Sequence, residues 1–175
     1  MASIGHVAVG MALGRHEAGP SSRGRLAASM ALFSALALLP DADVIAFKFG
    51  IPYAAPWGHR GASHSFVFAG LVALCIMGVA RLLRLPPGRT GLLAFLALAS
   101  HGLLDSLTDG GLGAALLWPF SNARLFAPVR PLPVAPIGYG MLSSRGLYVV
   151  AVEFFAFLPF WAFALWPRRR AAPES

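Results

Sequence analysis

Apolar residues fall into five runs along the chain, separated by short polar or Gly- and Pro-containing segments. We interpret the runs as helices, because they end at the Pro, Gly and Arg residues that typically stop a helix. The first run, residues 2–14, would span only about 20 Å as a helix, short of the ~30 Å hydrocarbon core of a bilayer. The pattern therefore predicts a short or re-entrant N-terminal helix and four main transmembrane helices, at residues 26–39, 66–83, 91–104 and 147–166.

The composition supports a membrane protein. Hydrophobic residues make up 57% of the 175 residues and charged residues only 12%, whereas a soluble domain carries roughly 25% charged residues. The single cysteine, Cys75, lies inside an apolar run, so neither a disulfide framework nor a Cys-based zinc site is expected. We predict an all-α, polytopic membrane helix bundle that forms one domain over residues 1–175, with residues 168–175 as a cytoplasmic tail.

Basic residues gather at one end of the predicted helices. They form three clusters, at Arg15/Arg23/Arg25, at Arg81/Arg84/Arg89 and at Arg168–Arg170. Such clusters mark cytoplasmic loops, so the C-terminus is expected in the cytoplasm. Topology accounts in this way for the net charge of +7. We therefore expect membrane lipids as partners and no nucleic acid, and the sequence leaves the oligomeric state open.

The opposite, outer ends of the helices carry the side chains that suit a metal ion. They are Asp41, Asp43, His59, His64 and Asp105, and His6 joins them if the chain starts on the outer side. Counted at 1.5 Å per residue, Asp41, Asp105 and Glu153 each lie about 22–24 Å above the basic end of their helix. That height is somewhat below the outer boundary of a ~30 Å core. Ionisable groups at such a depth are costly and are usually paired, hydrated in a cavity or functional.

Three motifs on this side each have an ordinary explanation beside a metal-binding one. His101 and Asp105 are four residues apart, so they share a helix face and can hold one ion or form an interhelical hydrogen bond. The pair Asp41 and Asp43 can bind a cation or cap a helix end, while His59 and His64 can be ligands or interfacial histidines. Their coincidence at one side and one depth favours a metal site with seven candidate ligands: His6, Asp41, Asp43, His59, His64, His101 and Asp105.

The residue types indicate which ion and which chemistry to expect. Imidazole and carboxylate without thiolate favour a borderline-hard divalent ion, so we expect one or two zinc ions, with manganese or magnesium as alternatives. Two ions that share a carboxylate would lower the pKa of a bound water and clamp the attacking and leaving oxygens. We count Asp43 and Arg60 as catalytic candidates, Arg60 because a guanidinium stabilises charge on a phosphate oxygen. Glu153 is a third candidate, and a salt bridge to Arg60 or Arg145 is its alternative role.

Further polar residues of the outer side have two interpretations each. Arg124, Arg130 and Arg145 either bind anionic substrate or lipid headgroups, or extend to the membrane interface as such side chains commonly do. Ser63 and Ser65 are expected to orient ligands or to cap the helix that begins at residue 66.

These motifs resemble a known family. His6, the segment Leu39-Pro40-Asp41-Ala42-Asp43, the segment His59-Arg60-Gly61-x-x-His64-Ser65 and His101-x-x-x-Asp105 resemble the YdjM family of bacterial inner-membrane proteins. The resemblance covers residues 1 to about 126 and implies a membrane-bound, metal-dependent hydrolase of the bacterial inner membrane. The positions of the basic clusters place its metal site toward the periplasm. The ligand order is more distantly similar to zinc-dependent phospholipase C and the S1/P1 nucleases. Their further His-x-x-x-Glu motif is not found after Asp105, which favours one or two ions over three.

We therefore expect a phosphoesterase that acts on a lipid or lipid-linked phosphate at the outer leaflet through a metal-activated water. A lipid phosphatase with a histidine nucleophile is an alternative, but Ser63-His64 and Ser144-Arg145 are only fragments of its motifs. An intramembrane metalloprotease is less well supported, because no His-Glu-x-x-His segment occurs. A non-catalytic protein, with a structural metal or a role as metal carrier, remains open because the sequence does not separate it from an enzyme.

Overall fold

The regular secondary structure of the chain is helical over the part that its computed structural model describes, residues 3–167, with loops at residues 51–61 and 107–137. Over these residues no strand forms, and two isolated β-bridges link loop segments. The all-α prediction is confirmed, whereas the predicted tail at 168–175 and the cluster Arg168–Arg170 lie outside the described residues. The helices are α1 (Ser3–Ala18), α2 (Arg23–Leu38), η1 (Leu39–Phe49), η2 (Ala62–His64), α3 (Phe66–Leu82), α4 (Pro87–Ser106), η3 (Gly138–Leu142), α5 (Ser144–Ala156) and α6 (Leu158–Leu165).

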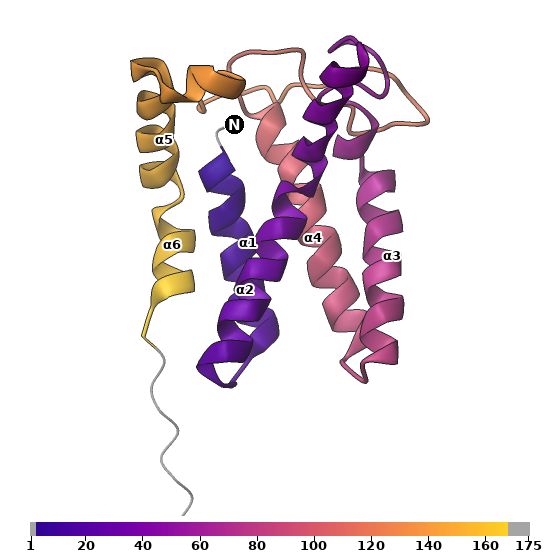
Figure 1. Ribbon diagram of the computed structural model, residues 1–175, viewed down its shortest axis with the longest axis vertical. Coiled ribbons are helices and arrows are strands. Elements are labelled where there is room, and N and C mark those ends of the chain that lie inside the picture. The colour runs from indigo at the N-terminus through magenta and orange to yellow at the C-terminus, as the bar shows by residue number, and fades with distance from the viewer. Residues whose placement is uncertain (1–2, 168–175) are drawn as a thin grey trace, which may run out of the picture.

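The long helices stand side by side along the longest axis of the molecule (Figure 1). The turns α1–α2 and α3–α4 lie at the lower end in this view, while η1 and the segments around η2 and η3 cover the upper end. α1 packs on α2, α3 on α4, and α2 on α4. Gly10 and Gly14 allow the first of these contacts, because a Cβ at either position would collide with the backbone of α2. The basic clusters that flank the two turns therefore share the lower end.

Large apolar side chains face outward along the helices. On α3 and α4 the exposed ones include Leu71, Leu74, Val79, Leu92, Leu96 and Leu103. The buried core between α2, α3 and α4 consists of few large residues, such as Phe33, Leu36 and Leu93, with several alanines. Exposed apolar surface of this extent marks contact with a membrane or a partner rather than with water.

The second helix does not end at Pro40 as its proline suggests. The chain continues from α2 into η1, a 3₁₀-helix with Pro40 in its first turn, and ends only at Gly50 in a left-handed conformation. Proline fits a first turn because the missing N–H is not needed there. In a 3₁₀-helix, residues two positions apart point about 120° away from each other, so Asp41 and Asp43 face different neighbours.

The predicted helix over residues 147–166 is broken. α5 and α6 meet at an angle of 65° around Phe157. Pro159 sits in the first turn of α6 and has no N–H to donate to the carbonyl of Phe155, so the ladder is interrupted. Phe157 is buried at the bend against Ala8 and Val9 of α1. The expectation of one straight helix here was wrong.

Helix lengths alone do not confirm four transmembrane helices. The stretch Arg23–Phe49 is long and apolar enough to cross a membrane, and the bent pair α5–α6 is a second such stretch if it counts as one span. α3 is apolar but shorter, with 17 residues or about 26 Å. α1 reaches Ala18, beyond the predicted end at residue 14, and so includes Arg15.

Candidate metal centre

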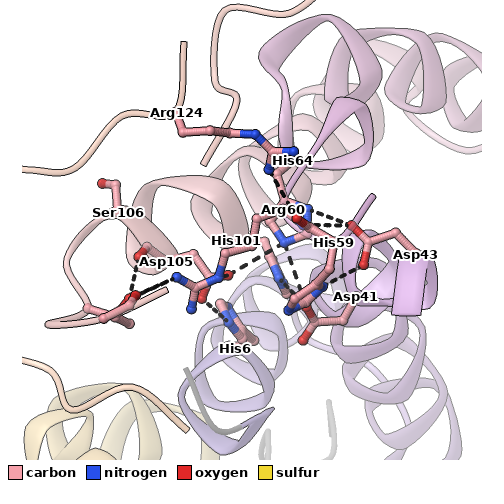
Figure 2. Close-up of polar contacts among 12 residues, drawn as sticks. His6, Asp41, Asp43, His59, Arg60, His64, His101, Asp105, Ser106 and Arg124 are labelled. Carbon is pink, nitrogen blue, oxygen red and sulfur yellow. Dashed lines mark hydrogen bonds and ion pairs between the residues drawn. The ribbon is translucent and has the colours of Figure 1, made fainter. Parts of the chain in front are cut away.

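Four side chains from three separate helices converge at the upper end of the bundle (Figure 2). Asp41 comes from η1, His64 from η2, and His101 and Asp105 from adjacent turns of α4. One ligand atom from each lies within 4.8 Å of the others. These residues are up to 64 positions apart in the sequence, so the fold rather than local sequence brings them together.

The separations between these ligand atoms suit a tetrahedral ion. Asp41 Oδ1 lies 3.2 Å from His101 Nε2 and 3.6 Å from His64 Nε2. His64 Nε2 lies 3.5 Å from Asp105 Oδ2. A zinc ion bound at about 2.0–2.1 Å in tetrahedral geometry holds its ligand atoms about 3.3–3.4 Å apart. The observed separations bracket that value.

The two imidazoles are oriented as metal ligands. The Nε2 atoms of His64 and His101 are buried and have no hydrogen-bond partner among the described residues. The Nδ1 of His101 lies 2.6 Å from the carbonyl oxygen of Ala37. In 3₁₀ geometry this carbonyl would accept from the backbone N–H of residue 40, but Pro40 has none. The Nδ1 of His64 lies 3.2 Å from Asp43. A ligating histidine characteristically uses its second nitrogen in this way, and the hydrogen bond fixes the tautomer that leaves Nε2 for the metal.

Local sequence explains how His64 reaches α4. Ser65 ends the His-rich loop and caps α3, where its Oγ accepts a hydrogen bond of 3.1 Å from the N–H of Phe68, as predicted for a capping serine. The loop backbone then lies directly against α4 at Gly102, where a Cβ would collide with the carbonyl of His64. Gly102, next to His101 on α4, therefore permits the close approach that the centre needs.

Asp43 lies outside the four-residue group and contacts its neighbours instead. Its Oδ1 is 2.7 Å from His59 Nδ1, and its Oδ2 accepts hydrogen bonds from the Arg60 N–H at 3.0 Å and the Ser63 hydroxyl at 2.6 Å. With His59 and His64 it forms a second group able to hold an ion. These short hydrogen bonds fit best a carboxylate that orients the histidines, as metal centres commonly have.

His6 lies beside the centre but is not one of its four converging residues. Its ring is fully buried and stacks on His101 with 3.7 Å between centroids. Its Nε2 is 3.7 Å from Asp105 Oδ1, and neither ring nitrogen has a hydrogen-bond partner among the described residues. His6 can therefore join as an additional ligand after a small shift.

Arg60 is buried, and its guanidinium pairs with Asp105 of the centre. Its Nε is 2.8 Å from Asp105 Oδ2, and its Nη1 donates to Thr108 Oγ1 and to the carbonyl of Gly110, each at 3.1 Å. The guanidinium therefore fixes the orientation of a ligand carboxylate. Thr108, fully buried, was not expected as a site residue, because a threonine after a helix end carries no signal in the sequence.

Glu153, the third catalytic candidate, contacts the first turn of α1. Its carboxylate is fully buried and accepts a hydrogen bond of 3.1 Å from the N–H of Gly5, in the first turn of α1. It belongs to neither of the two ligand groups among the described residues. The observed contact ties α5 to α1 one residue before His6.

The outer arginines have structural contacts. Arg124 donates to the carbonyls of His59 at 3.0 Å and Ala55 at 2.8 Å, so it clamps the His-rich loop. Burial lowers the pKa of its guanidinium from the ordinary value. Arg130 lies over the ring of Phe126, and Arg145 pairs with Asp109 at 3.9 Å.

The electrostatics of the cluster favour positive charge at its middle. Burial lowers the pKa of His64, but the three neighbouring aspartates, Asp105 foremost, outweigh burial and raise the pKa to about 10. A divalent ion bound to Nε2 would supply positive charge in place of the proton. The residues present therefore fit a metal ion in both geometry and charge.

A cavity of about 400 Å³ adjoins the centre. Its polar wall includes Asp41, Tyr53, His59, Arg60 and Asp105. Burial raises the pKa of Tyr53, so its hydroxyl stays protonated at neutral pH and can donate a hydrogen bond. The side chain of Asp41 is 26% exposed, the largest exposure in the four-residue group. The arrangement can hold an ion with one side open to a water or substrate.

Comparison with known proteins gives a family and one relative. A family model described as "YdjM inner membrane protein" matches residues 1–171. The inner membrane protein YbcI of Escherichia coli (strain K12) is 46% identical over 110 residues, which cover 62% of this chain and 64% of that protein. The match thus spans somewhat less than two thirds of the relative's length. No solved structure matches the chain significantly.

Proposed function

The chain belongs to the YdjM family of inner membrane proteins, and from that premise we propose that it is a metal-dependent hydrolase of phosphate esters. The observation that carries the proposal is the pair of buried Nε2 atoms on His64 and His101, which face Asp41 and Asp105 without a hydrogen-bond partner. Such orphaned atoms are expensive in a bilayer-embedded protein unless a ligand satisfies them. A metal ion at this point satisfies all four residues together.

Zinc is the ion that the residues suit best, with manganese or magnesium as alternatives. When bound, the ion would supply a Lewis acid and an activated water. Asp41, His64, His101 and Asp105 would hold it, and Arg60 would keep Asp105 in position. His59, whose Nδ1 is hydrogen-bonded to Asp43, would use its Nε2 to accept or donate a proton at the cavity.

The substrate class follows from the cavity wall and the membrane. We assign the activity to a lipid or lipid-linked phosphate in the outer leaflet, because apolar residues such as Val44, Ile137 and Met141 line the cavity beside the carboxylates. A soluble phosphate ester would need no such wall. The phosphoester would lie next to Asp41 and Arg60.

The orientation rests on the charges at the lower end. Arg15, Arg23, Arg25, Arg81, Arg84 and Arg89 flank the two lower turns. We propose that this end faces the cytoplasm, by the rule that basic loops stay inside, and that α2–η1, α3, α4 and the bent pair α5–α6 cross the membrane. The candidate centre would then lie near the periplasmic face, with the C-terminus in the cytoplasm.

A structural metal site is the alternative from another class. Three of the four residues are almost completely buried, as in a closed structural site. The partial exposure of Asp41 and the adjoining cavity favour the hydrolase, because a catalytic ion keeps an open position.

Metal content tests the proposal first. Wild-type protein purified in detergent should hold about one equivalent of divalent metal by elemental mass spectrometry, because the four converging ligand atoms surround a single ion-sized position. Asp105→Asn should lose it, while Asp109→Asn, a neighbouring carboxylate outside the ligand group, should retain it. Metal-loaded wild type should then cleave phosphodiesters, and a chelator should stop it. If wild type binds no metal even after metal is added, the metal centre is refuted. If the metal-loaded protein shows no hydrolysis, the metal has a structural role instead.

A further inference from the structure

The cavity beside the centre has an apolar wall formed by a single stretch of chain. Val134, Pro136, Ile137 and Met141 line it, and all belong to residues 134–142, which we call the rim segment. Val44 of η1 adds to the apolar side. An apolar wall that faces a polar one suits a ligand with both a charged and an apolar part.

The same rim segment presents apolar side chains to the outside. Tyr139 is 94% exposed and Leu142 is 82% exposed, and Ile137 is exposed as well as lining the cavity. Leu147 and Tyr148 continue this exposed apolar surface into α5. In water such a patch would be costly, whereas at a membrane interface aromatic and aliphatic side chains are enriched.

Asp109, three residues beyond the end of α4, contacts the start of the rim segment and the helix α5 that follows it. The N–H of Val134 donates to Asp109 Oδ1 at 2.7 Å, and Arg145 approaches Asp109 Oδ2 at 3.9 Å. The preceding residue, Thr108, receives a hydrogen bond from Arg60, which in turn pairs with Asp105. A short chain of contacts thus holds the rim segment at a defined position relative to the metal centre.

What covers the exposed side of the rim segment follows from the family. Because the chain is an inner membrane protein whose long helices expose leucines along their length, a bilayer surrounds the bundle. The rim segment lies at the upper end of α5, where Figure 1 places η3 beside the start of that helix. It therefore lies at the boundary between the hydrocarbon of one leaflet and the loops that cover the upper end of the bundle, which we call the loop layer.

We propose that the rim segment is inserted into the outer leaflet and that an amphiphilic phosphoester passes along it from the bilayer into the cavity. The phosphoester would stop beside Asp41 and Asp105, while its apolar chain would remain against Ile137 and Met141. This inference rests on the proposed hydrolase function and adds to it the entry route and the requirement for a lipid tail.

Two chromogenic phosphodiesters with the same leaving group test the route. Hexadecyl p-nitrophenyl phosphate is held in phospholipid vesicles, and methyl p-nitrophenyl phosphate is dissolved in water; both are offered to protein reconstituted in the same vesicles. The double variant Tyr139→Asp/Leu142→Asp should lower kcat/KM for the hexadecyl ester about tenfold, since each carboxylate is unfavourable in the interface. Its kcat/KM for the methyl ester should stay within about twofold, because neither side chain lines the cavity.

Phe120→Asp is the matched control. Phe120 is an aromatic residue of the same loop layer, 87% exposed, and it does not line the cavity. It should leave both rates within about twofold of wild type. The inference is overturned if the double variant slows both esters equally, if it slows neither, or if Phe120→Asp slows the hexadecyl ester to the same extent.

A second readout is independent of activity. In a Cys75→Ser background, which removes the single native cysteine, Leu142→Cys carries an environment-sensitive fluorophore in vesicles. We expect quenching by lipids with a nitroxide near the headgroup and protection from aqueous iodide. The opposite result would overturn insertion of the rim segment even if both esters are cleaved. If metal-loaded wild type cleaves neither ester, the proposed function and the entry route fail together, and the fluorophore still decides whether the rim segment lies in the bilayer.

Discussion

Helices α1 and α4 meet through ionisable side chains at both ends of the bundle, but the two meeting points are balanced differently. At the lower end Glu17 pairs with Arg89 Nε at 3.4 Å and accepts a hydrogen bond from the hydroxyl of Thr90. Arg89 also donates to the carbonyl of His16. One carboxylate faces one guanidinium, and the charges cancel without any further group.

At the upper end the carboxylates gather around histidines instead. Asp41, Asp43 and Asp105 bring three carboxylates together, and Arg60 pairs with Asp105. The buried Nε2 atoms of His64 and His101 face oxygen atoms of Asp41 and Asp105 at 3.2–3.6 Å. The comparison teaches that buried ionisable residues indicate a metal only where acceptor atoms from several residues face one another.

The largest contrast between the two ends is expected in metal binding. His101→Ala removes a ligand nitrogen, so the variant should lose bound metal and its hydrolysis should fall by about a thousandfold or more. Glu17→Ala, at the other end of α1 and α4, should keep both metal and activity. Elemental mass spectrometry and rates on the soluble ester measure the two properties side by side. Equal losses in both variants would mean that the upper end is no more than a second structural ion pair.

A smaller effect within the upper end separates ligands from orienting groups. Asp43→Asn keeps the size of the side chain but weakens its hold on His59 and His64. Loss of such an outer contact typically costs about 10–100-fold in metal affinity, so the variant should still bind metal, only more weakly. Competition with a chelator of known affinity measures this. If Asp43→Asn abolishes binding as completely as His101→Ala, Asp43 is itself a ligand and a second ion has to be considered.

Sequence reasoning found the participants of the upper end better than their roles. The four-residue spacing of His101 and Asp105 places both on one helix face. The basic clusters place Asp41 and His64 on the same side of the predicted bundle, so the sequence predicted that the four residues come together. Asp43 and Arg60 were counted as catalytic candidates, and their observed contacts are with His59 and Asp105. Such roles depend on the direction of each side chain. For Asp43 that direction is set by the 3₁₀ geometry of η1, which the sequence pattern did not predict.

Glu153 shows why depth along a helix is an insufficient guide. Its height was counted along one straight helix over residues 147–166, but the chain bends by 65° near Phe157. Pro159 was the available signal, since proline lacks the N–H that a continuous helix requires. Arg124 is a comparable case: its contacts are backbone carbonyls of the His-rich loop, distant in sequence, and no local pattern encodes them.

The smallest expected effect lies at the lower end and concerns stability alone. Glu17→Gln removes the ionic component of the contact with Arg89 and Thr90, and a single hydrogen-bonded contact of this kind contributes about 0.5–1.5 kcal/mol. The variant should therefore unfold at a slightly lower temperature than wild type in the same detergent. Removing the metal with a chelator should lower Tm further, by a similar amount in variant and wild type. Glu17 and His6, the α1 residue beside the metal centre, are about 16 Å apart along the helix. At this distance the destabilisation caused by Glu17→Gln and that caused by metal removal should simply add. A chelator effect that disappears in Glu17→Gln would show instead that α1 couples the two ends.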